Sequence, residues 1–260
     1  MQQELSALII TLNEENNIKD LLQELDFVDE IIIVDSFSTD KTIEFALQFP
    51  KVKIFQHKFE DFTKQRNIAL QYATNDWILF LDADERLTFE NKAEITRVIQ
   101  NPNAKDAYLM YRQFYYCKKK IHFSSTQNDK NFRLFRKSKA HYDKTKKVHE
   151  TLIVNGTVGY LTSKLIHYSF SSYEEYKMKM IHYGILKGQE KYNNGKNYSL
   201  YKHIFKVIFK FFKGYFLQLG ILDGIAGIQI AYLKSLSDHY SYISLKESRN
   251  TFRFSDQRPI

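Results

Sequence analysis

Short apolar runs alternate with amphipathic stretches through the first third of the chain. The runs are rich in β-branched and aromatic residues and stop abruptly at polar ones, as strands buried on both faces of a sheet do. Between them, apolar residues recur at helical spacing, which predicts helices with short connections. The predicted strands are 5–11, 30–34, 52–57 and 77–81, and the predicted helices are 18–25, 41–48 and 62–73. This alternation predicts an α/β fold with a mostly parallel, Rossmann-like sheet covered on both faces.

The hydrophobic pattern changes after a further predicted helix at 91–100. Residues 107–116 and 131–136 are aromatic-rich or alternating, which predicts strands of a smaller mixed sheet beside the parallel one. From residue 171 onward the composition becomes helical and aromatic. We therefore expect two parts, an α/β domain over 1–170 and a helical region over 171–260.

Polar side chains follow three of the predicted parallel strands, at Thr11, Asp35 and Asp82. The carboxyl ends of parallel strands lie at one edge of a sheet, and open α/β sheets bind their ligands there. We therefore expect these three residues to line one crevice of nucleotide size.

The last of these strands ends in the DxD sequence Asp82-Ala83-Asp84. Two aspartates separated by one small residue can share a divalent cation, one directly and one through water, because Mg²⁺ takes oxygen ligands and keeps several waters. The alternative is that they cap the helix that starts near Phe89, since aspartate is a good N-cap residue.

Composition indicates the charge of a binding partner and the cell compartment. The 38 Lys and Arg against 30 Asp and Glu give a net charge of +8, and the excess gathers at 118–120, 137–147 and 202–213. Such asymmetry indicates a phosphate-bearing partner, whether a nucleotide, a nucleic acid or an anionic lipid. The single cysteine, Cys117, suits a reducing compartment, and the first apolar run has no basic leader before it. We therefore expect the catalytic part to be cytoplasmic.

The sequence contains no glycine-rich phosphate loop of the GxGxxG or GxxxxGKS/T type. This counts against a dinucleotide dehydrogenase and a P-loop phosphotransferase. A diphosphate would then need a metal and basic side chains, which Asp84, Lys64 and Arg66 could supply. Arg133 and Arg136 could also pair with phosphates, or they could lie on a solvated basic strand face.

The chain contains, in this order, the segments TLNEENNI, IIIVDSFSTDKT, KQRNIAL and WILFLDADERL. This succession resembles the family 2 glycosyltransferases of the GT-A fold, and most of all their lipopolysaccharide-core glucosyltransferase subgroup, whose members also carry a later VHE tripeptide. The resemblance covers residues 4–170. The chain departs from the family pattern at Phe37, where relatives usually have glycine, and at Ser36, which replaces a second aspartate common in the wider family.

The resemblance implies a donor site for a nucleotide-diphospho-sugar. Thr11, Asn13 and Glu14 would lie along the uridine, and Asp35 would contact the base or the ribose. Helix capping is the alternative role for Asn13 and Glu14, and for Asp40 we expect capping. The residues implied for the donor are Thr11, Asn13, Glu14, Asp35, Lys64, Arg66, Asp82 and Ala83.

The resemblance also implies a metal cofactor, Mg²⁺ or Mn²⁺. Asp82 would face the ribose and the metal, and Asp84 would bind the metal. GT-A enzymes often have a histidine near the position of His167 that completes the metal shell, and imidazole is an acceptable ligand for Mn²⁺ beside carboxylates. The alternative for His167 is an ordinary local hydrogen bond at a strand end.

An inverting sugar transfer needs a base that takes the proton of the acceptor hydroxyl, and a carboxylate in a partly desolvated cleft suits this role. We predict Glu150, in the VHE tripeptide, as this base. Its alternative role is an ion pair with Lys147, and Asp129 is the second candidate for the base. His149 is expected to position or pack.

The predicted helix over 200–215 combines a basic stripe with a wide apolar face, which is typical of a helix that lies in a membrane interface. The lysines of the stripe are Lys202, Lys206, Lys210 and Lys213. Residues 214–232 are apolar over nearly the ~20 residues that a crossing needs. Asp223 and four glycines argue against a crossing, and we expect an interfacial or re-entrant helical hairpin at the inner leaflet.

These observations predict a metal-dependent, inverting glycosyltransferase that moves a sugar from a nucleotide donor, such as a UDP-sugar, to a lipid-linked or cell-envelope saccharide such as lipopolysaccharide core. The enzyme would be peripherally bound to the cytoplasmic membrane and would have no nucleic-acid partner. One alternative is a sugar nucleotidyltransferase, which usually has a glycine-rich basic loop after its first strand. The other is a non-catalytic basic membrane-binding protein, which would leave the three aspartates unexplained.

Overall fold

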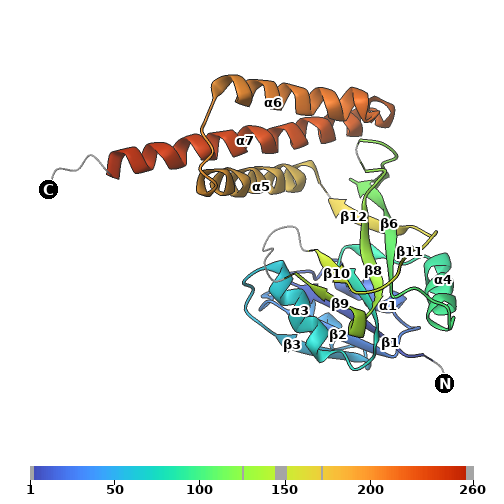
Figure 1. Cartoon of the computed structure of the whole chain (residues 1–260). Coiled ribbons are helices and arrows are strands. Elements are labelled where there is room, and N and C mark those ends of the chain that lie inside the picture. Colours follow the sequence, from blue (N-terminus) through green and yellow to red (C-terminus); the bar gives the residue numbers. More distant parts are fainter. Residues whose placement is uncertain (1–2, 125, 144–150, 171, 256–260) are drawn as a thin grey trace. The chain divides into compact units, whose positions relative to one another are not determined.

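The computed structural model describes residues 3–124, 126–143, 151–170 and 172–255, with side chains described as far as Ser248 (Figure 1). The chain forms two compact units, one of residues 1–112 and 129–167 and the other of residues 113–128 and 168–260. The division predicted at residue 170 assigned 113–128 to the α/β part, whereas in the structure this segment belongs to the helical unit.

The parallel part of the first unit follows the predicted order of strands and helices. Its strands pair in parallel in the order β3-β2-β1-β4. The register places Thr11 beside Asp35 and Ile10 beside Asp82, so the predicted polar ends lie at one edge of the sheet. The elements are β1 (Leu5–Thr11), α1 (Ile18–Glu24), β2 (Glu30–Asp35), α2 (Thr42–Ala46), β3 (Val52–Gln56), α3 (Phe62–Tyr72) and β4 (Trp77–Asp82).

The start of one helix differs from the prediction, and the cap of another excludes one of the alternatives. The helix predicted over 41–48 begins only at Thr42, whose amide donates to Asp40 Oδ1 at 3.0 Å. The alternative of a capping role for Asp82 or Asp84 at the next helix is wrong, because that helix, α4 (Phe89–Ile99), is capped by Thr88. Thr88 and Asn91 form a reciprocal capping box, which satisfies two amides that would otherwise be unpaired.

The same sheet continues beyond β4 in the order β4-β8-β6-β12-β5, with β7 and β11 also paired to β6. Strand β8 pairs antiparallel with β4 and β6, and β12 with β5, whereas β11 pairs in parallel with β6. The prediction of a mostly parallel sheet accompanied by a smaller sheet is confirmed, but β6 and β8 extend the large sheet and the small one consists of β9 and β10. The remaining elements are β5 (Glu85–Arg86), β6 (Ala107–Tyr116), β7 (Lys119–Lys120), β8 (Lys130–Arg136), η1 (Lys137–Lys139), β9 (Ala140–Tyr142), β10 (Leu152–Val154), β11 (Val158–Tyr160) and β12 (Leu165–Phe170).

Alternate residues of the central strands face opposite layers, as the pleat of a strand requires. Leu5, Ala7 and Ile9 of β1 pack into the core that includes α1 and α4. Leu8 points the other way, into a second core with α3 and the β9–β10 pair. Because both faces of the sheet are covered, its carboxyl edge is the place where polar side chains from several strands can meet.

The helical unit is built on α5 (Tyr173–Asn193), α6 (Leu200–Phe212) and α7 (Ile225–Ser255). Helices α5 and α7 approach closely, since a Cβ added at Gly184 would lie 2.5 Å from the Ser237 carbonyl oxygen. Between α6 and α7, a π-helical turn, η2 (Lys213–Leu217), and a 3₁₀ turn, η3 (Gly220–Asp223), reverse the chain. Residues 214–232 thus hold the turn of a helical hairpin and the start of its second arm.

Asp223, which argued against a membrane crossing, is buried within the helical unit. Its carboxylate accepts hydrogen bonds from the amides of His122 and Phe123 at 3.0 and 3.1 Å, and from the Ser124 hydroxyl at 2.6 Å. Among the helices in the described part of the chain, none combines the length and the apolarity needed to cross a membrane.

Candidate active site

Hydrogen bonds join the loops that follow β1 and β2. The Asn13 amide donates to Ser38 Oγ at 2.9 Å, and the Thr39 amide donates to Asn13 Oδ1 at 2.8 Å. The Glu14 amide donates to Thr42 Oγ1 at 2.7 Å. Asn13 has a φ of 56°, a left-handed conformation that asparagine adopts more readily than most residues. These bonds fix the surface that carries two of the predicted donor contacts, Asn13 and Glu14.

Asp35 is fully buried at the end of β2. Its carboxylate accepts hydrogen bonds from the Thr11 hydroxyl at 3.1 Å, the Ser38 amide at 2.9 Å and the Gln56 side chain at 3.3 Å. Phe37, which stands where the family pattern has glycine, has a φ of 64° and an exposed ring. Glycine adopts this conformation without steric cost, so the departure changes the side chain and keeps the glycine-type backbone of the turn.

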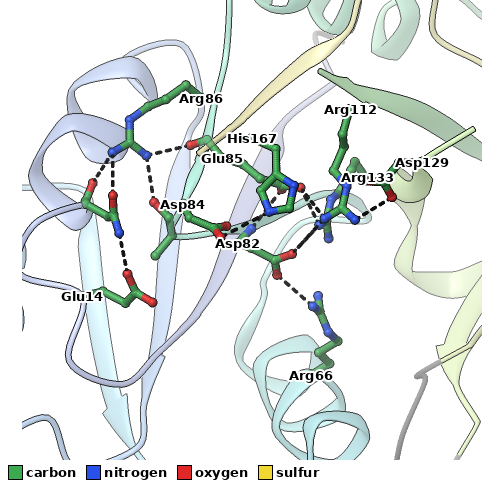
Figure 2. A network of polar contacts seen from close by, with 12 residues as sticks. Glu14, Arg66, Asp82, Asp84, Glu85, Arg86, Arg112, Asp129, Arg133 and His167 are labelled. Carbon is green, nitrogen blue, oxygen red and sulfur yellow. Dashed lines mark hydrogen bonds and ion pairs between the residues drawn. The ribbon is translucent and has the colours of Figure 1, made fainter. Parts of the chain in front are cut away.

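Arginines surround Asp82 at the end of β4 (Figure 2). Arg66 Nη2 lies 2.8 Å from Asp82 Oδ1, Arg133 Nη2 donates to Oδ2, and Arg112 Nη1 lies 3.9 Å from the same oxygen. Glu85, which is fully buried, accepts hydrogen bonds from Arg133 at 2.7 Å and from Arg112 at 3.3 Å. We call these five residues the arginine cluster.

In the arginine cluster, the guanidinium groups and the carboxylates keep one another ionised. Burial alone would raise the pKa of Asp82, but Arg133, Arg66 and Arg112 outweigh it and hold this pKa well below its ordinary value. Burial likewise would lower the pKa of Arg133, and the charges of Asp82 and Glu85 raise it instead. A cation bound directly by Asp82 would be repelled by the guanidinium groups around it, which argues against Asp82 as a direct metal ligand.

Asp84 and His167 form a second polar pair, with His167 Nε2 lying 3.2 Å from Asp84 Oδ2 (Figure 2). The two residues are 83 positions apart in sequence. Antiparallel pairing of β5 with β12, in which His167 is opposite Glu85, brings the histidine to the DxD turn. The structure therefore places together two of the three residues that the resemblance implied at the metal, Asp84 and His167.

Arg86 holds the DxD turn in position. Its guanidinium donates to the carbonyl oxygen of Ala83 at 2.8 Å and to that of Asn17 at 3.0 Å. The Asn17 side chain in turn donates to Glu14 Oε2 at 2.8 Å. Ala83, a predicted donor contact, is buried, and its carbonyl oxygen is the one that accepts the Arg86 hydrogen bond.

The Asp84–His167 pair fits a divalent cation as part of a coordination shell. Within the described residues, no group of three or more His, Cys, Asp and Glu side chains is placed to hold a metal ion. A carboxylate and an imidazole are both ligands that Mn²⁺ accepts, and Mg²⁺ commonly uses one or two carboxylates plus waters and substrate phosphates. The remaining ligands would therefore come from water and from the substrate.

A hollow of about 340 Å³ adjoins the arginine cluster, and its lining includes Arg66, Asp82, Arg133, Lys130 and Thr151. This volume is within the range of small-molecule sites. A larger hollow of about 680 Å³ runs along α4, but its lining contains none of the predicted site residues. Chemistry rather than size therefore singles out the smaller hollow.

Three of the predicted residues lie apart from these groups or cannot be placed. Lys64 pairs with Glu60 on the surface, with half of its side chain exposed, and the structure does not bring it into the arginine cluster. Glu150 and His149 lie outside the described residues. Thr151, the next residue in the chain, lines the 340 Å³ hollow.

Sequence reasoning missed Glu85 and Arg112 as members of the site, and it offered two roles for Arg133 that do not fit. Arg133 is only 2% exposed, so it is not on a solvated face, and its guanidinium is paired with protein carboxylates. Arg136 lies over the Trp77 ring at 4.3 Å. A charged residue flanked by apolar ones within a strand, as in the NFRLFR segment, was the available signal for Arg133.

Replacing Arg133 with methionine should lower the free energy of unfolding by about 3–5 kcal/mol, because it leaves the carboxylates of Asp82 and Glu85 buried with less compensating charge. Urea denaturation followed by circular dichroism measures this change. Lys64→Ala, which breaks the exposed pair with Glu60, is the matched control and should cost less than about 1 kcal/mol. Equal losses in the two variants would contradict a structural role for the cluster.

The family model described as Glycosyl transferase family 2 matches residues 6–176 of the chain. The lipopolysaccharide core biosynthesis glycosyltransferase LpsC of Rhizobium meliloti is 28% identical over 241 residues, which cover 88% of this chain and 89% of LpsC. An uncharacterized glycosyltransferase of Rickettsia felis is 28% identical over 262 residues, covering 95% of this chain and 90% of the relative.

Among solved structures, that of S. aureus TarS 1–349 in complex with UDP-GlcNAc is similar, with a TM-score of 0.51 and 15% sequence identity. The similarity covers 96% of this chain and 92% of that one. At this level of identity the likeness concerns the fold, and the predicted GT-A type of α/β fold is confirmed.

Proposed function

The chain belongs to glycosyltransferase family 2, and on this basis we propose that it transfers a sugar from a UDP-sugar to a saccharide of the cell envelope. The donor class is supported by the resemblance of the segments after β1, β2 and β4 and by the UDP-GlcNAc held by TarS, which shares the fold. The acceptor class is supported by LpsC, whose name assigns it to lipopolysaccharide core biosynthesis. Family membership favours this function over a sugar nucleotidyltransferase.

One observation carries the proposal: Asp84 and His167 meet at 3.2 Å, at the carboxyl edge where the register also places Thr11, Asp35 and Asp82. This edge is where open α/β sheets bind nucleotides. We assign the diphosphate of the donor to the Asp84–His167 side and the nucleoside to the joined loops that carry Asn13 and Glu14.

In an inverting transfer, different residues of the chain would act on the acceptor, on the diphosphate and on the donor. The acceptor hydroxyl oxygen attacks the anomeric carbon, the bond from that carbon to the diphosphate oxygen breaks, and the hydroxyl proton passes to Glu150. Asp84 and His167 would hold a divalent cation, and the charge of that cation would help to neutralise the departing diphosphate. The arginine cluster keeps Asp82 ionised and fixed, so that it can orient the donor.

A panel of nucleotide sugars tests the proposal directly. The purified protein, incubated with UDP-, GDP- and CMP-sugars with and without Mn²⁺, should slowly release UDP from at least one UDP-sugar and should do so faster with Mn²⁺. Release of nucleotide from none of the donors, with or without metal, would contradict a transferase acting on nucleotide sugars.

We also propose that the enzyme works while peripherally bound to the inner leaflet of the cytoplasmic membrane. Helix α6 has 13 residues, and among these only His203 is buried. Its large apolar side chains are exposed to an extent unusual for a water-facing helix. The exposed ones are Leu200, Tyr201, Ile204, Phe205, Ile208, Phe209 and Phe212.

The charges of α6 suit an anionic bilayer. Lys202, Lys206 and Lys210 are exposed on the same helix, and Lys213 follows at its end. The apolar exposure continues through the turn to α7, with Phe216, Leu217, Ile221, Leu222 and Ile225. Basic side chains next to a wide apolar face favour insertion at the boundary between anionic headgroups and acyl chains.

Replacing both Phe205 and Ile208 with aspartate should weaken binding to vesicles of phosphatidylglycerol and phosphatidylcholine at least about tenfold, because each side chain contributes roughly 1.5–3 kcal/mol when buried in an apolar phase. Both are more than half exposed, so folding should be unaffected. Phe89→Asp, at an 81% exposed position on α4, is the control and should bind normally. Binding unchanged in the double variant would contradict the membrane face, and protein that stays in native membranes after salt and alkali washing would contradict peripheral attachment.

A further inference from the structure

We propose that Lys130, Tyr111 and Tyr160 form an anion subsite for the acceptor, so that the sugar receiving the transferred residue carries a carboxylate or a phosphate. The inference rests on the proposed function, because it names the chemistry of the acceptor for the same site. The three side chains come from neighbouring strands: the register pairs Tyr111 of β6 with Lys130 of β8, and Tyr160 of β11 with Leu109 of β6.

Two aromatic rings hold the Lys130 ammonium in place. Lys130 Nζ lies 4.8 Å from the centroid of the Tyr160 ring and 5.3 Å from that of the Tyr111 ring. The two rings are stacked, with centroids 6.2 Å apart and planes 21° apart. A cation over aromatic faces is oriented without being neutralised, because rings carry no net charge.

Of the three basic side chains that line the 340 Å³ hollow, Lys130 is the one whose charge is not paired with a carboxylate of the described residues. Arg66, Arg133 and Lys130 line it together with Asp82. Arg66 and Arg133 are engaged by Asp82 and, for Arg133, by Glu85 as well. Among the described residues Lys130 forms no ion pair with a carboxylate, and its partners are the rings and hydroxyls of Tyr111 and Tyr160.

The position of this unneutralised charge favours the acceptor over the donor. The proposed diphosphate contacts, Asp84 and His167, do not line the hollow, whereas Asp82, which would orient the donor, lies at it. Thr151, which directly follows the predicted base Glu150, does line it. An oriented cation at the rim of a hollow with sugar-sized volume, flanked by the half-exposed Tyr160 ring, suits a saccharide with an acidic group.

The test compares small sugar probes by NMR titration of the full-length protein saturated with UDP and Mn²⁺. The probes are methyl glucuronide, glucose 6-phosphate and methyl glucoside. Wild type should bind both acidic probes about fivefold more tightly than the neutral one, the size expected of a partly exposed ion pair. The two acidic probes show whether carboxylate or phosphate is preferred.

Lys130→Met should abolish this preference, whereas Lys130→Arg should retain most of it. Lys139→Met, at an exposed lysine of η1 outside the hollow, is the matched control and should behave as wild type. The affinity for UDP should be the same in all variants. Equal binding of acidic and neutral probes by wild type, or a preference that survives in Lys130→Met, would overturn the proposal.

Two further outcomes separate this proposal from the one on which it rests. Loss of UDP affinity in Lys130→Met would assign the cation to the donor and overturn the acceptor subsite while leaving the transferase function standing. Failure of wild type to bind any nucleotide with Mn²⁺ would instead count against the proposed function itself.

Discussion

Replacing Asp84 with asparagine is expected to lower the rate of sugar transfer by roughly a thousandfold, because a metal at a departing phosphate contributes several kcal/mol to the transition state. Asparagine keeps the shape of the side chain but removes the charge that holds the cation. Asp84 has His167 as its neighbour at 3.2 Å and lies outside the arginine cluster, so folding should be preserved. The measurement is UDP release from the preferred UDP-sugar over a range of Mn²⁺ concentrations.

Asp20→Asn is a suitable control for Asp84→Asn, since the Asp20 side chain is 69% exposed and lies 3.9 Å from its basic neighbour, Arg86. It should leave the rate within about twofold of wild type, as surface substitutions usually have small effects. An Asp84→Asn enzyme as active as this control would show that the DxD turn does not hold the metal.

Replacing Glu150 with glutamine should reduce kcat by about 10²–10⁴-fold, the usual contribution of a general base. Glutamine cannot take the acceptor proton, but it is close in size, so the affinity for the donor should not change. Steady-state kinetics of UDP release with the preferred UDP-sugar and an acceptor measure kcat and the KM for the donor.

Asp129→Asn distinguishes the two candidate bases. Arg112 Nη2 lies 2.7 Å from Asp129 Oδ1, and a carboxylate that is paired with a guanidinium is a weaker base. We therefore expect Asp129→Asn to keep far more activity than Glu150→Gln. The reverse order, with Asp129→Asn inactive and Glu150→Gln active, would assign the base to Asp129.

Most of the parallel sheet could be predicted from sequence because three of its strands, β1, β2 and β4, are buried on both faces. Short apolar runs such as WILFL are typical of strands buried on both faces, and each run ends in a polar residue at the edge of the sheet. The register then had to place Thr11, Asp35 and Asp82 close together, as the structure confirms. Parallel strands have the same direction, so their carboxyl ends lie at the same edge of the sheet. Polar residues that follow these strands in the sequence are therefore neighbours in the structure.

The arginine cluster could not be predicted in the same way because it depends on which strands become neighbours. Arg133 and Asp82 are 51 residues apart, and they meet only because β8 pairs antiparallel with β4. Neither residue carries a local signal of that pairing. Asp84 and His167 are even farther apart, and it was the family resemblance, not their spacing, that put them together.

The turn after β2 shows how a departure from a family pattern can be resolved by backbone geometry. Phe37 stands where relatives usually have glycine, and its φ of 64° is a conformation that glycine adopts without steric cost. The ring of Phe37 is exposed at this turn. Sequence alone gives the identity of such a residue but not the conformation that it adopts.

The most direct test of a cation-dependent nucleotide site is calorimetric titration of UDP into wild type, Asp84→Asn and His167→Ala, each with and without Mn²⁺. We predict that Mn²⁺ tightens UDP binding to wild type at least about tenfold and has little effect on either variant, since the ion would bridge these side chains and the diphosphate. Binding of UDP that is equally dependent on Mn²⁺ in all three proteins, or independent of it in wild type, would contradict this assignment.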